Sequence, residues 1–209
     1  MNYFPMFMDI RNREILLCGG GVHALEKLER LLSFGPCIRI ISPKITPETQ
    51  RAAEAFHGAM LERRFFEKKD LDSAPVFVIA AEEREENVRI VNACRERNIP
   101  VNAVDMQDLC DFIFPAMLTS EHSCIGISTG GLSPAAAVEL KRNVAEAVPE
   151  HLDDILLWMA QIRPAVRERI RDKTSQRAVL RGLVQEAFRL DRPLTEEEVE
   201  RNFDNRICF

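Results

Sequence analysis

The six cysteines of this chain include no C-x-x-C pair, and its four histidines include no H-x-x-x-H pair. Because protein-built metal sites use such spacings, we expect no dedicated metal site. The N-terminus also lacks the basic start of a secretory signal and reaches Asp9 too early for one. We therefore expect reduced thiols that behave as small hydrophobic groups, in a cytoplasmic protein.

Long hydrophobic runs are missing as well. The longest, APVFVIAA at 74–81, is too short to cross a bilayer. The net charge of −5 argues against a general nucleic-acid binder, although a local basic patch is compatible with it. The chain has no G-x-S-x-G elbow and no P-loop, since Lys27 follows the glycines at the wrong spacing. Its 46% hydrophobic and 29% charged residues suffice for a folded core.

The first half of the chain alternates between apolar runs and segments with helical spacing. Strands are predicted at 14–18, 38–41, 61–66, 75–81 and 99–104, and helices at 22–34, 46–57 and 85–98. In the last of these helices, Val88, Val91 and Cys94 are expected to point inward. This alternation is typical of an α/β fold with a parallel sheet, and we assign residues 1–113 to a Rossmann-like domain.

The pattern changes after residue 113. FIFPAMLTS and CIGISTGG predict two strands with no long helix between them, which form a hairpin or extend the sheet of a partner. A helix capped by Ser133 follows, and Pro149 ends it. We assign residues 114–149 to a dimerisation region and residues 150–209 to a C-terminal helical region, in which Thr195 and Glu198 form a capping box. A homodimer is the expected assembly.

A glycine turn joins the first predicted strand to the first predicted helix. Gly19, Gly21 and Ala24 match the dinucleotide pattern G-x-G-x-x-[GA]. In that pattern the first glycine permits the tight turn, the second lets a diphosphate approach the backbone, and the third small residue lets the helix pack closely. The alternative is a turn that serves chain geometry alone, but the flanking strand and helix favour a nucleotide.

The second strand lacks the acid that usually holds the ribose of NAD. Ser42, Pro43 and Lys44 stand there instead. The serine can still bond a ribose hydroxyl, and Lys44 either pairs with the 2′-phosphate of NADP or is simply solvated. NAD is the expected cofactor, and NADP is not excluded.

Asp105 follows the fifth predicted strand directly. Because ligands of open parallel sheets bind outside the carboxyl ends of the strands, Asp105 is expected at the same edge as the glycine turn. There a carboxylate can serve as a general acid or base. The alternative is an N-cap or turn residue for the segment MQDLC, and position alone does not decide between the two.

Taken together, several segments resemble the precorrin-2 dehydrogenase family of sirohaem synthesis. They are FPMFMDIRNREILLCGGG, Lys27, VNAVD, DFIFPA and ISTGGLSPAAA, and the resemblance covers residues 3 to about 150. It implies a Rossmann domain, a dimerisation region and a helical region. It also implies oxidation of precorrin-2 to sirohydrochlorin with transfer of hydride to NAD⁺; some members also insert Fe²⁺ as a substrate.

The resemblance assigns roles to individual residues. It makes Asp105 the key aspartate, and it places cofactor contacts at Val22, His23, Pro43 and Lys44, to which we add Gly19, Gly21, Ser42, Ala80 and Ala81. The segment STGGLSP implies substrate contacts at Ser128, Thr129, Gly130, Gly131 and Ser133. Basic residues expected to meet the substrate carboxylates are Lys141, Arg142 and the arginines at 163, 167, 169 and 171.

Three departures from the family pattern fall on the nucleotide side. His23 replaces a small apolar residue, Glu26 replaces a basic one, and Glu82 stands in a shortened segment after the fourth strand. They bear on cofactor affinity and choice more than on the fold. The competing hypothesis is a non-enzymatic NAD(P)-binding sensor that acts through its helical tail, and a third is a member that has lost oxidation.

Overall fold

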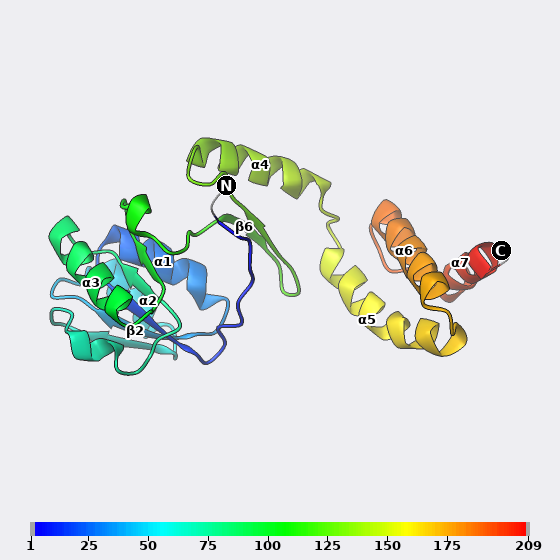
Figure 1. Cartoon of the computed structure of the whole chain (residues 1–209). Helices are drawn as coiled ribbons and strands as arrows, with labels where there is room; N and C mark the ends of the chain where they lie inside the picture. Colours follow the sequence, from blue (N-terminus) through cyan, green and yellow to red (C-terminus); the bar gives the residue numbers. More distant parts are fainter. Residues whose placement is uncertain (1–2, 208–209) are drawn as a thin grey trace. The chain divides into compact units, whose positions relative to one another are not determined.

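The computed structural model describes residues 3–207. The chain forms two compact units, which meet in the sequence at Phe114 and Pro115. The first unit contains a parallel sheet with helices, and the second contains a β-hairpin followed by helices (Figure 1).

The sheet of the first unit has five strands in the order β3-β2-β1-β4-β5. These are β1 (Glu14–Cys18), β2 (Cys37–Ile41), β3 (Ala59–Glu62), β4 (Val78–Ala80) and β5 (Val101–Ala103). Every neighbouring pair is parallel, which confirms the predicted fold class. The chain order reverses between β1 and β4, and ligands of such sheets bind outside the carboxyl ends of the strands at this switch point.

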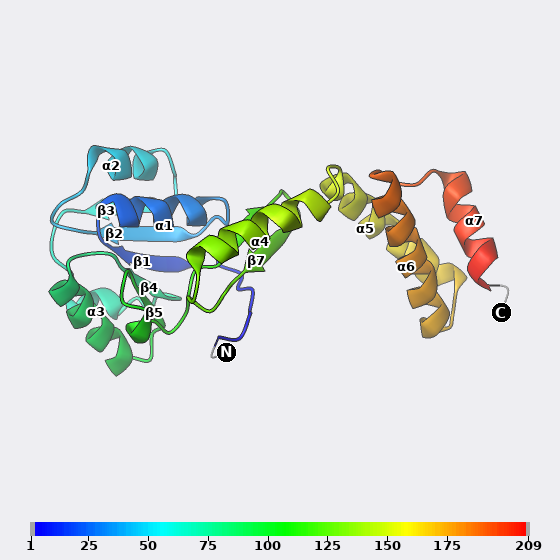
Figure 2. The ribbon, with the colours of Figure 1, turned by 90° about the horizontal axis from the view of Figure 1, so that it is seen from above.

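Helices cover both faces of the sheet. Figure 2 shows α1 (Val22–Leu32) and α2 (Pro47–Glu54) on one side and α3 (Arg84–Glu96) on the other. Ile15 and Leu17 of β1 point into the core beneath α1 and α2, whereas Leu16 and Cys18 point into the core beneath α3. Burial on both faces explains why the strands are continuous apolar runs rather than alternating ones.

Two local predictions in this unit are wrong. The third strand ends at Glu62 instead of continuing to residue 66, because the Arg64 N–H turns back to the Glu62 carbonyl at 3.1 Å and Phe65 is exposed. In α3 the residue predicted to point inward, Val88, is 37% exposed, while its neighbour Asn87 is buried. Val91 and Cys94 are buried as predicted.

The second unit begins with an antiparallel hairpin of β6 (Ala116–Thr119) and β7 (Cys124–Ile127). The hairpin pairs within the chain, so one of the two predicted arrangements is observed. Helix α4 (Pro134–Ala147) packs against it (Figure 2). The Asp153 carboxylate at the start of the next helix accepts hydrogen bonds from the hairpin turn: the Ser120 hydroxyl at 2.6 Å and the Glu121 and His122 N–H groups at 3.0 and 3.2 Å.

Three further helices share a core of their own. They are α5 (Leu152–Arg169), α6 (Lys173–Leu190) and α7 (Glu196–Ile207), and Ile155, Val179, Leu183 and Phe203 pack together between them. The Thr195 hydroxyl accepts from Glu198 N–H, and the Glu198 carboxylate accepts from Thr195 N–H, which confirms the predicted capping box. Over residues 3–207, no helix has the length and apolarity that a membrane span requires.

Candidate functional site

The three consecutive glycines, Gly19, Gly20 and Gly21, differ in how closely other atoms approach them. A Cβ at Gly19 would lie 2.6 Å from the Ala81 carbonyl oxygen, and a Cβ at Gly20 would lie 2.7 Å from the Cα of Ile45. These two glycines therefore let the neighbouring loops pack against the turn. A Cβ at Gly21 would have no atom within 4 Å. Gly21 thus leaves open space at the point where the dinucleotide pattern needs a close approach to the backbone.

Gly21 is also the N-cap of α1. No side chain caps this helix, and its first turn carries no acidic residue. The first N–H groups of a helix have no partner within the helix, and with the helix dipole they attract anions. Ala24 is fully buried between the helix and the sheet, as the third small position of the pattern requires. The turn therefore fits a dinucleotide diphosphate.

A cavity of about 760 Å³ lies at this edge of the sheet. Six of the residues predicted for the site line it, namely Gly21, Val22, His23, Lys44, Ala81 and Asp105. The remaining lining residues are Ile45, Thr46, Arg63, Glu82, Glu83, Arg84, Asn87, Val104 and Met106. The other predicted cofactor residues, Gly19, Ser42, Pro43 and Ala80, are absent from this lining.

Asp105 stands beside the glycine turn, as predicted from the strand order. Its Oδ2 atom lies 3.8 Å from Nε2 of His23, and its side chain is 84% exposed. The residue has a φ of 58°, in the left-handed region that aspartate tolerates in turns. Asp105 therefore lies in a turn, as one form of the alternative predicted. Met106 occupies the N-cap position of the 3-10 helix that follows, so the N-cap interpretation of Asp105 is wrong.

Ser42 is buried and already has partners. Its hydroxyl lies 2.9 Å from the Lys44 carbonyl oxygen and within hydrogen-bond distance of Oε1 of Glu82. Burial raises the pKa of Glu82, and the Ser42 hydrogen bond partly offsets this rise. The sequence identified Glu82 only as a departure from the family pattern, and its contact with the end of β2 was not predicted.

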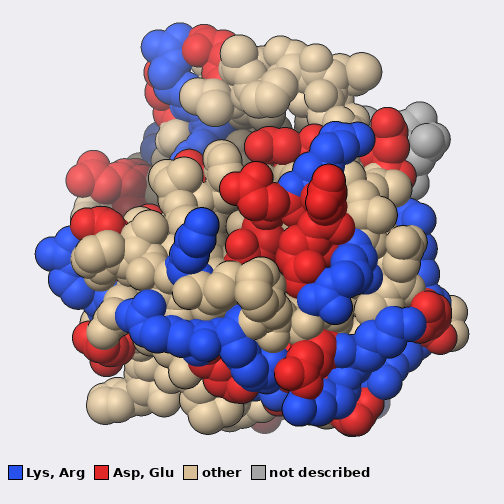
Figure 3. Space-filling model, turned by 90° about the vertical axis from the view of Figure 1, so that its left-hand side faces the viewer, with Lys and Arg blue, Asp and Glu red and all other residues tan. Residues whose placement is uncertain are grey.

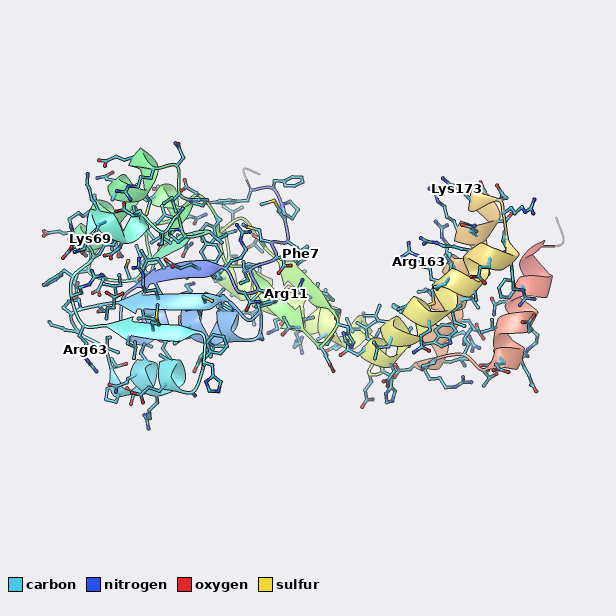
Figure 4. All side chains as sticks on the ribbon, turned by 90° about the horizontal axis from the view of Figure 1, so that it is seen from below. Phe7, Arg11, Arg63, Lys69, Arg163 and Lys173 are labelled. Atoms are coloured by element: carbon cyan, nitrogen blue, oxygen red, sulfur yellow. The ribbon has the colours of Figure 1, made fainter. Side chains whose placement is uncertain are left out.

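Asn87 and Arg63 were also not predicted as site residues. Asn87 Oδ1 accepts from Glu82 N–H, and Asn87 Nδ2 donates to the Glu82 carbonyl, both at 2.9 Å. Arg63 Nη2 donates to Gln50 Oε1 at 2.6 Å, and Figure 4 shows Arg63 beyond the end of β3. A polar residue at a helical position that should be apolar is the one sequence signal that could have identified Asn87.

The charges around the cavity are mixed. Three acidic side chains line it, Glu82, Glu83 and Asp105, and three basic ones, Lys44, Arg63 and Arg84. Figure 3 views the side of the protein toward which the strands point, and acidic side chains gather there beside a row of basic ones. The site can therefore hold an anionic group and also present carboxylates to hydroxyl or N–H donors.

The predicted substrate segment lies in the second unit, at the start of α4. Gly130 and Gly131 both have positive φ, 64° and 82°, and Gly130 N–H donates to the Ser128 hydroxyl at 3.0 Å. Ser133 Oγ accepts from Ala136 N–H, which confirms it as the helix cap. The Thr129 hydroxyl donates to the Ser133 carbonyl at 2.9 Å. These bonds hold the segment in a fixed loop.

Across the described residues 3–207, no group of three His, Cys, Asp or Glu side chains is arranged to hold a metal ion.

The sequence of this chain is similar to those of known proteins. Residues 6–116, more than half of the chain, match the protein family described as "Putative NAD(P)-binding". A siroheme synthase of Methylococcus capsulatus is 32% identical over 178 residues, which are 85% of this chain and 37% of that protein. One of Thioalkalivibrio sulfidiphilus is 32% identical over 215 residues, which are 99% of this chain and 44% of that protein. The chain thus spans less than half the length of these relatives.

A solved structure also resembles this chain. The protein named SirC, precorrin-2 dehydrogenase, superimposes with a TM-score of 0.68 over 99% of this chain and 100% of that one, at 18% identity. At this level of identity the likeness establishes the fold, which both proteins share over their whole length.

Proposed function

Since the chain belongs to this NAD(P)-binding family, we propose that it is a dehydrogenase that oxidises precorrin-2 to sirohydrochlorin in sirohaem synthesis, with NAD⁺ as the cofactor. One observation carries the proposal: a single cavity is lined both by the open glycine Gly21 and by Asp105. The names of the relatives and of the similar structure support the choice of substrate.

The glycine turn holds the cofactor in this proposal. The diphosphate lies over Gly21, where it meets the uncapped N–H groups at the start of α1. Val22 and Ala81 line the space beside it. When bound, NAD⁺ supplies the acceptor for the hydride.

Asp105 takes the proton that leaves with the hydride. Because its side chain is 84% exposed, the carboxylate can reach a macrocycle that enters from solvent, and it can accept a bond from a pyrrole N–H group. His23, which also lines the cavity, has its Nε2 atom 3.8 Å from this carboxylate. In a member that also inserts Fe²⁺ as a substrate, the same carboxylate would help to deprotonate a pyrrole nitrogen.

The substrate carries eight carboxylates, so it needs hydrogen-bond donors and cations. We assign this role to the loop Ser128–Ser133 and to Lys141 and Arg142 on α4. Among the tail arginines, Arg169 is paired with Glu200 at 2.5 Å, and the side chains at 163, 167 and 171 are exposed.

The test is an assay of the purified chain with precorrin-2 and either NAD⁺ or NADP⁺, followed by the reduced nicotinamide and the visible spectrum. We expect turnover with NAD⁺. The variant Asp105→Asn should lose at least tenfold in kcat while retaining cofactor binding, whereas the exposed neighbour Asp108→Asn should not. Undiminished turnover in Asp105→Asn would remove its assigned role.

The same assay separates the alternatives. A sensor binds the nucleotide and leaves the absorption bands of the tetrapyrrole unchanged. A member without oxidation shifts these bands but forms no reduced nicotinamide. Addition of Fe²⁺ to the reaction product tests chelation, which would give the spectrum of sirohaem.

We also propose a homodimer through the second unit. Leu132 in the loop before α4 is 92% exposed, and Val138 and Leu140 on α4 are 64% and 47% exposed. Exposed apolar side chains gathered in one segment are typical of an interaction surface. Light scattering coupled to size exclusion should give twice the chain mass. Val138→Asp should shift the mass toward the monomer, and Asn143→Asp on the same helix should not.

A further inference from the structure

The second strand of this sheet ends without the carboxylate that is usual in dinucleotide-binding sheets, and a carboxylate that follows another strand lies against its end. Ser42 follows β2 and offers only a hydroxyl, which is buried. Glu82 follows β4, and its Oε1 atom meets that hydroxyl. Because β1 lies between β2 and β4, this contact joins the loops that follow two strands that are not neighbours in the sheet.

The local structure fixes this carboxylate. Asn87, which is only 2% exposed, bonds both the N–H and the carbonyl of Glu82 at 2.9 Å, so the backbone at residue 82 is held on both sides. The side chain is half-buried, and its other end is bonded to Ser42. An acid held at both its backbone and its carboxylate is preorganised to accept hydrogen bonds.

We propose that Glu82 is the residue that determines cofactor specificity, by accepting the ribose hydroxyls of NAD⁺ and repelling the 2′-phosphate of NADP⁺. The inference rests on the proposed function. Glu82 lines the same cavity as Gly21, and its contact with Ser42 puts the carboxylate at the end of β2. An acid there hydrogen-bonds the ribose 2′-hydroxyl in sheets of this kind.

The basic side chains near Glu82 would instead favour NADP⁺ over NAD⁺. Lys44, Arg63 and Arg84 line the cavity too, and cations there would favour a 2′-phosphate. However, Arg63 already donates to Gln50. The Lys44 and Arg84 side chains are exposed. Glu82 is the more buried and the more firmly held charge, so it should dominate the choice.

The experiment is a calorimetric titration of the full chain with NAD⁺ and with NADP⁺. We expect the unmodified chain to bind NAD⁺ at least tenfold more tightly than NADP⁺. Glu82→Gln keeps the shape of the side chain but removes its charge; it should weaken NAD⁺ and strengthen NADP⁺, so that the preference falls at least tenfold. Glu85→Gln makes the same charge change on the first turn of α3, away from the cavity lining, and should leave the preference unchanged.

Thermal unfolding of both variants shows whether they are folded, and Glu82→Asp provides a second variant that retains the charge. Its preference for NAD⁺ should lie between those of the unmodified chain and Glu82→Gln. If the unmodified chain prefers NADP⁺, or if Glu82→Gln binds the two nucleotides in the original ratio, the inference fails while the dehydrogenase proposal stands. If the unmodified chain binds neither nucleotide, both fail.

Discussion

The variant Gly21→Ala should distinguish the role of the glycine turn in the fold from its proposed role in binding the cofactor diphosphate. The backbone at Gly21 has φ −91° and ψ −166°, which an alanine adopts without strain. Its added methyl group would have no protein atom within 4 Å, so the fold has no reason to change. The methyl group would, however, project into the space at the start of α1 that the proposed diphosphate occupies.

We expect Gly21→Ala to have a small effect on the free energy of unfolding and a large effect on cofactor affinity. Removing a glycine at a compatible position stabilises a protein by about 0.4–1 kcal/mol through the unfolded state. Alanine is the poorer N-cap, and this costs a similar amount. The free energy of unfolding should therefore change by less than about 1 kcal/mol. Hydrogen bonds to a charged group contribute about 1.5–3 kcal/mol each, so displacing the diphosphate from even one N–H should weaken binding roughly ten- to a hundredfold.

The measurements are chemical unfolding followed by circular dichroism and calorimetric titration with NAD⁺. Gly20→Ala is the matched control, because its methyl group would collide with Ile45 and press on the loop whose Thr46 N–H donates to the Gly20 carbonyl at 2.9 Å. That variant should lose about 1–3 kcal/mol of stability. If Gly21→Ala binds NAD⁺ as tightly as the unmodified chain, the diphosphate does not lie over this turn.

Three further variants test other parts of the structure. Leu183→Ala empties a fully buried position in the helical core and should cost about 2–5 kcal/mol of unfolding free energy in urea, whereas the exposed Leu157→Ala should change it by less than about 0.5 kcal/mol. Hydrogen bonds from Arg192 and the Thr195 N–H lower the pKa of Glu198 to about 2. This contribution to stability is present above the ordinary pKa of glutamate and is lost as the pH falls toward 2, so Glu198→Gln should lower the unfolding temperature at pH 7 and have little effect at pH 2. Asn87→Ala should release the backbone of Glu82 and weaken NAD⁺ binding by a few-fold at constant NADP⁺ binding, which titration measures; equal loss for both nucleotides would contradict a role through Glu82.

The sequence was sufficient to predict the sheet because its strands are buried on both faces. Runs such as Ile15–Cys18 are apolar without alternation, and only a parallel sheet covered by helices buries them fully. The helix caps at Ser133 and Thr195 could be predicted because each side chain bonds a backbone N–H group only three residues away. The local sequence alone therefore specifies them.

The third strand could not be placed correctly from its own residues. The segment 61–66 has the apolar content of a strand, but Arg64 donates to both carboxylate oxygens of Asp70, at 2.6 and 2.8 Å, and these bonds draw the chain away from the sheet after Glu62. Asp70 lies six residues further along and is itself almost fully buried. An interaction of this kind is tertiary, and propensity does not report it.

The error at Val88 has a more informative cause. Helical periodicity ranks positions by hydrophobicity, and it therefore placed Val88 inside and left Asn87 unassigned. In the structure the buried position is Asn87, because the N–H and carbonyl of Glu82 need partners after β4 ends and the amide of Asn87 supplies both. The same two bonds fix the residue whose carboxylate crosses to Ser42. An apolar side chain at position 87 would leave both of these backbone groups without a partner, so the buried amide has a structural role. Because Glu82 and Asn87 also line the cavity, the same two bonds set the position of an acid at the candidate site.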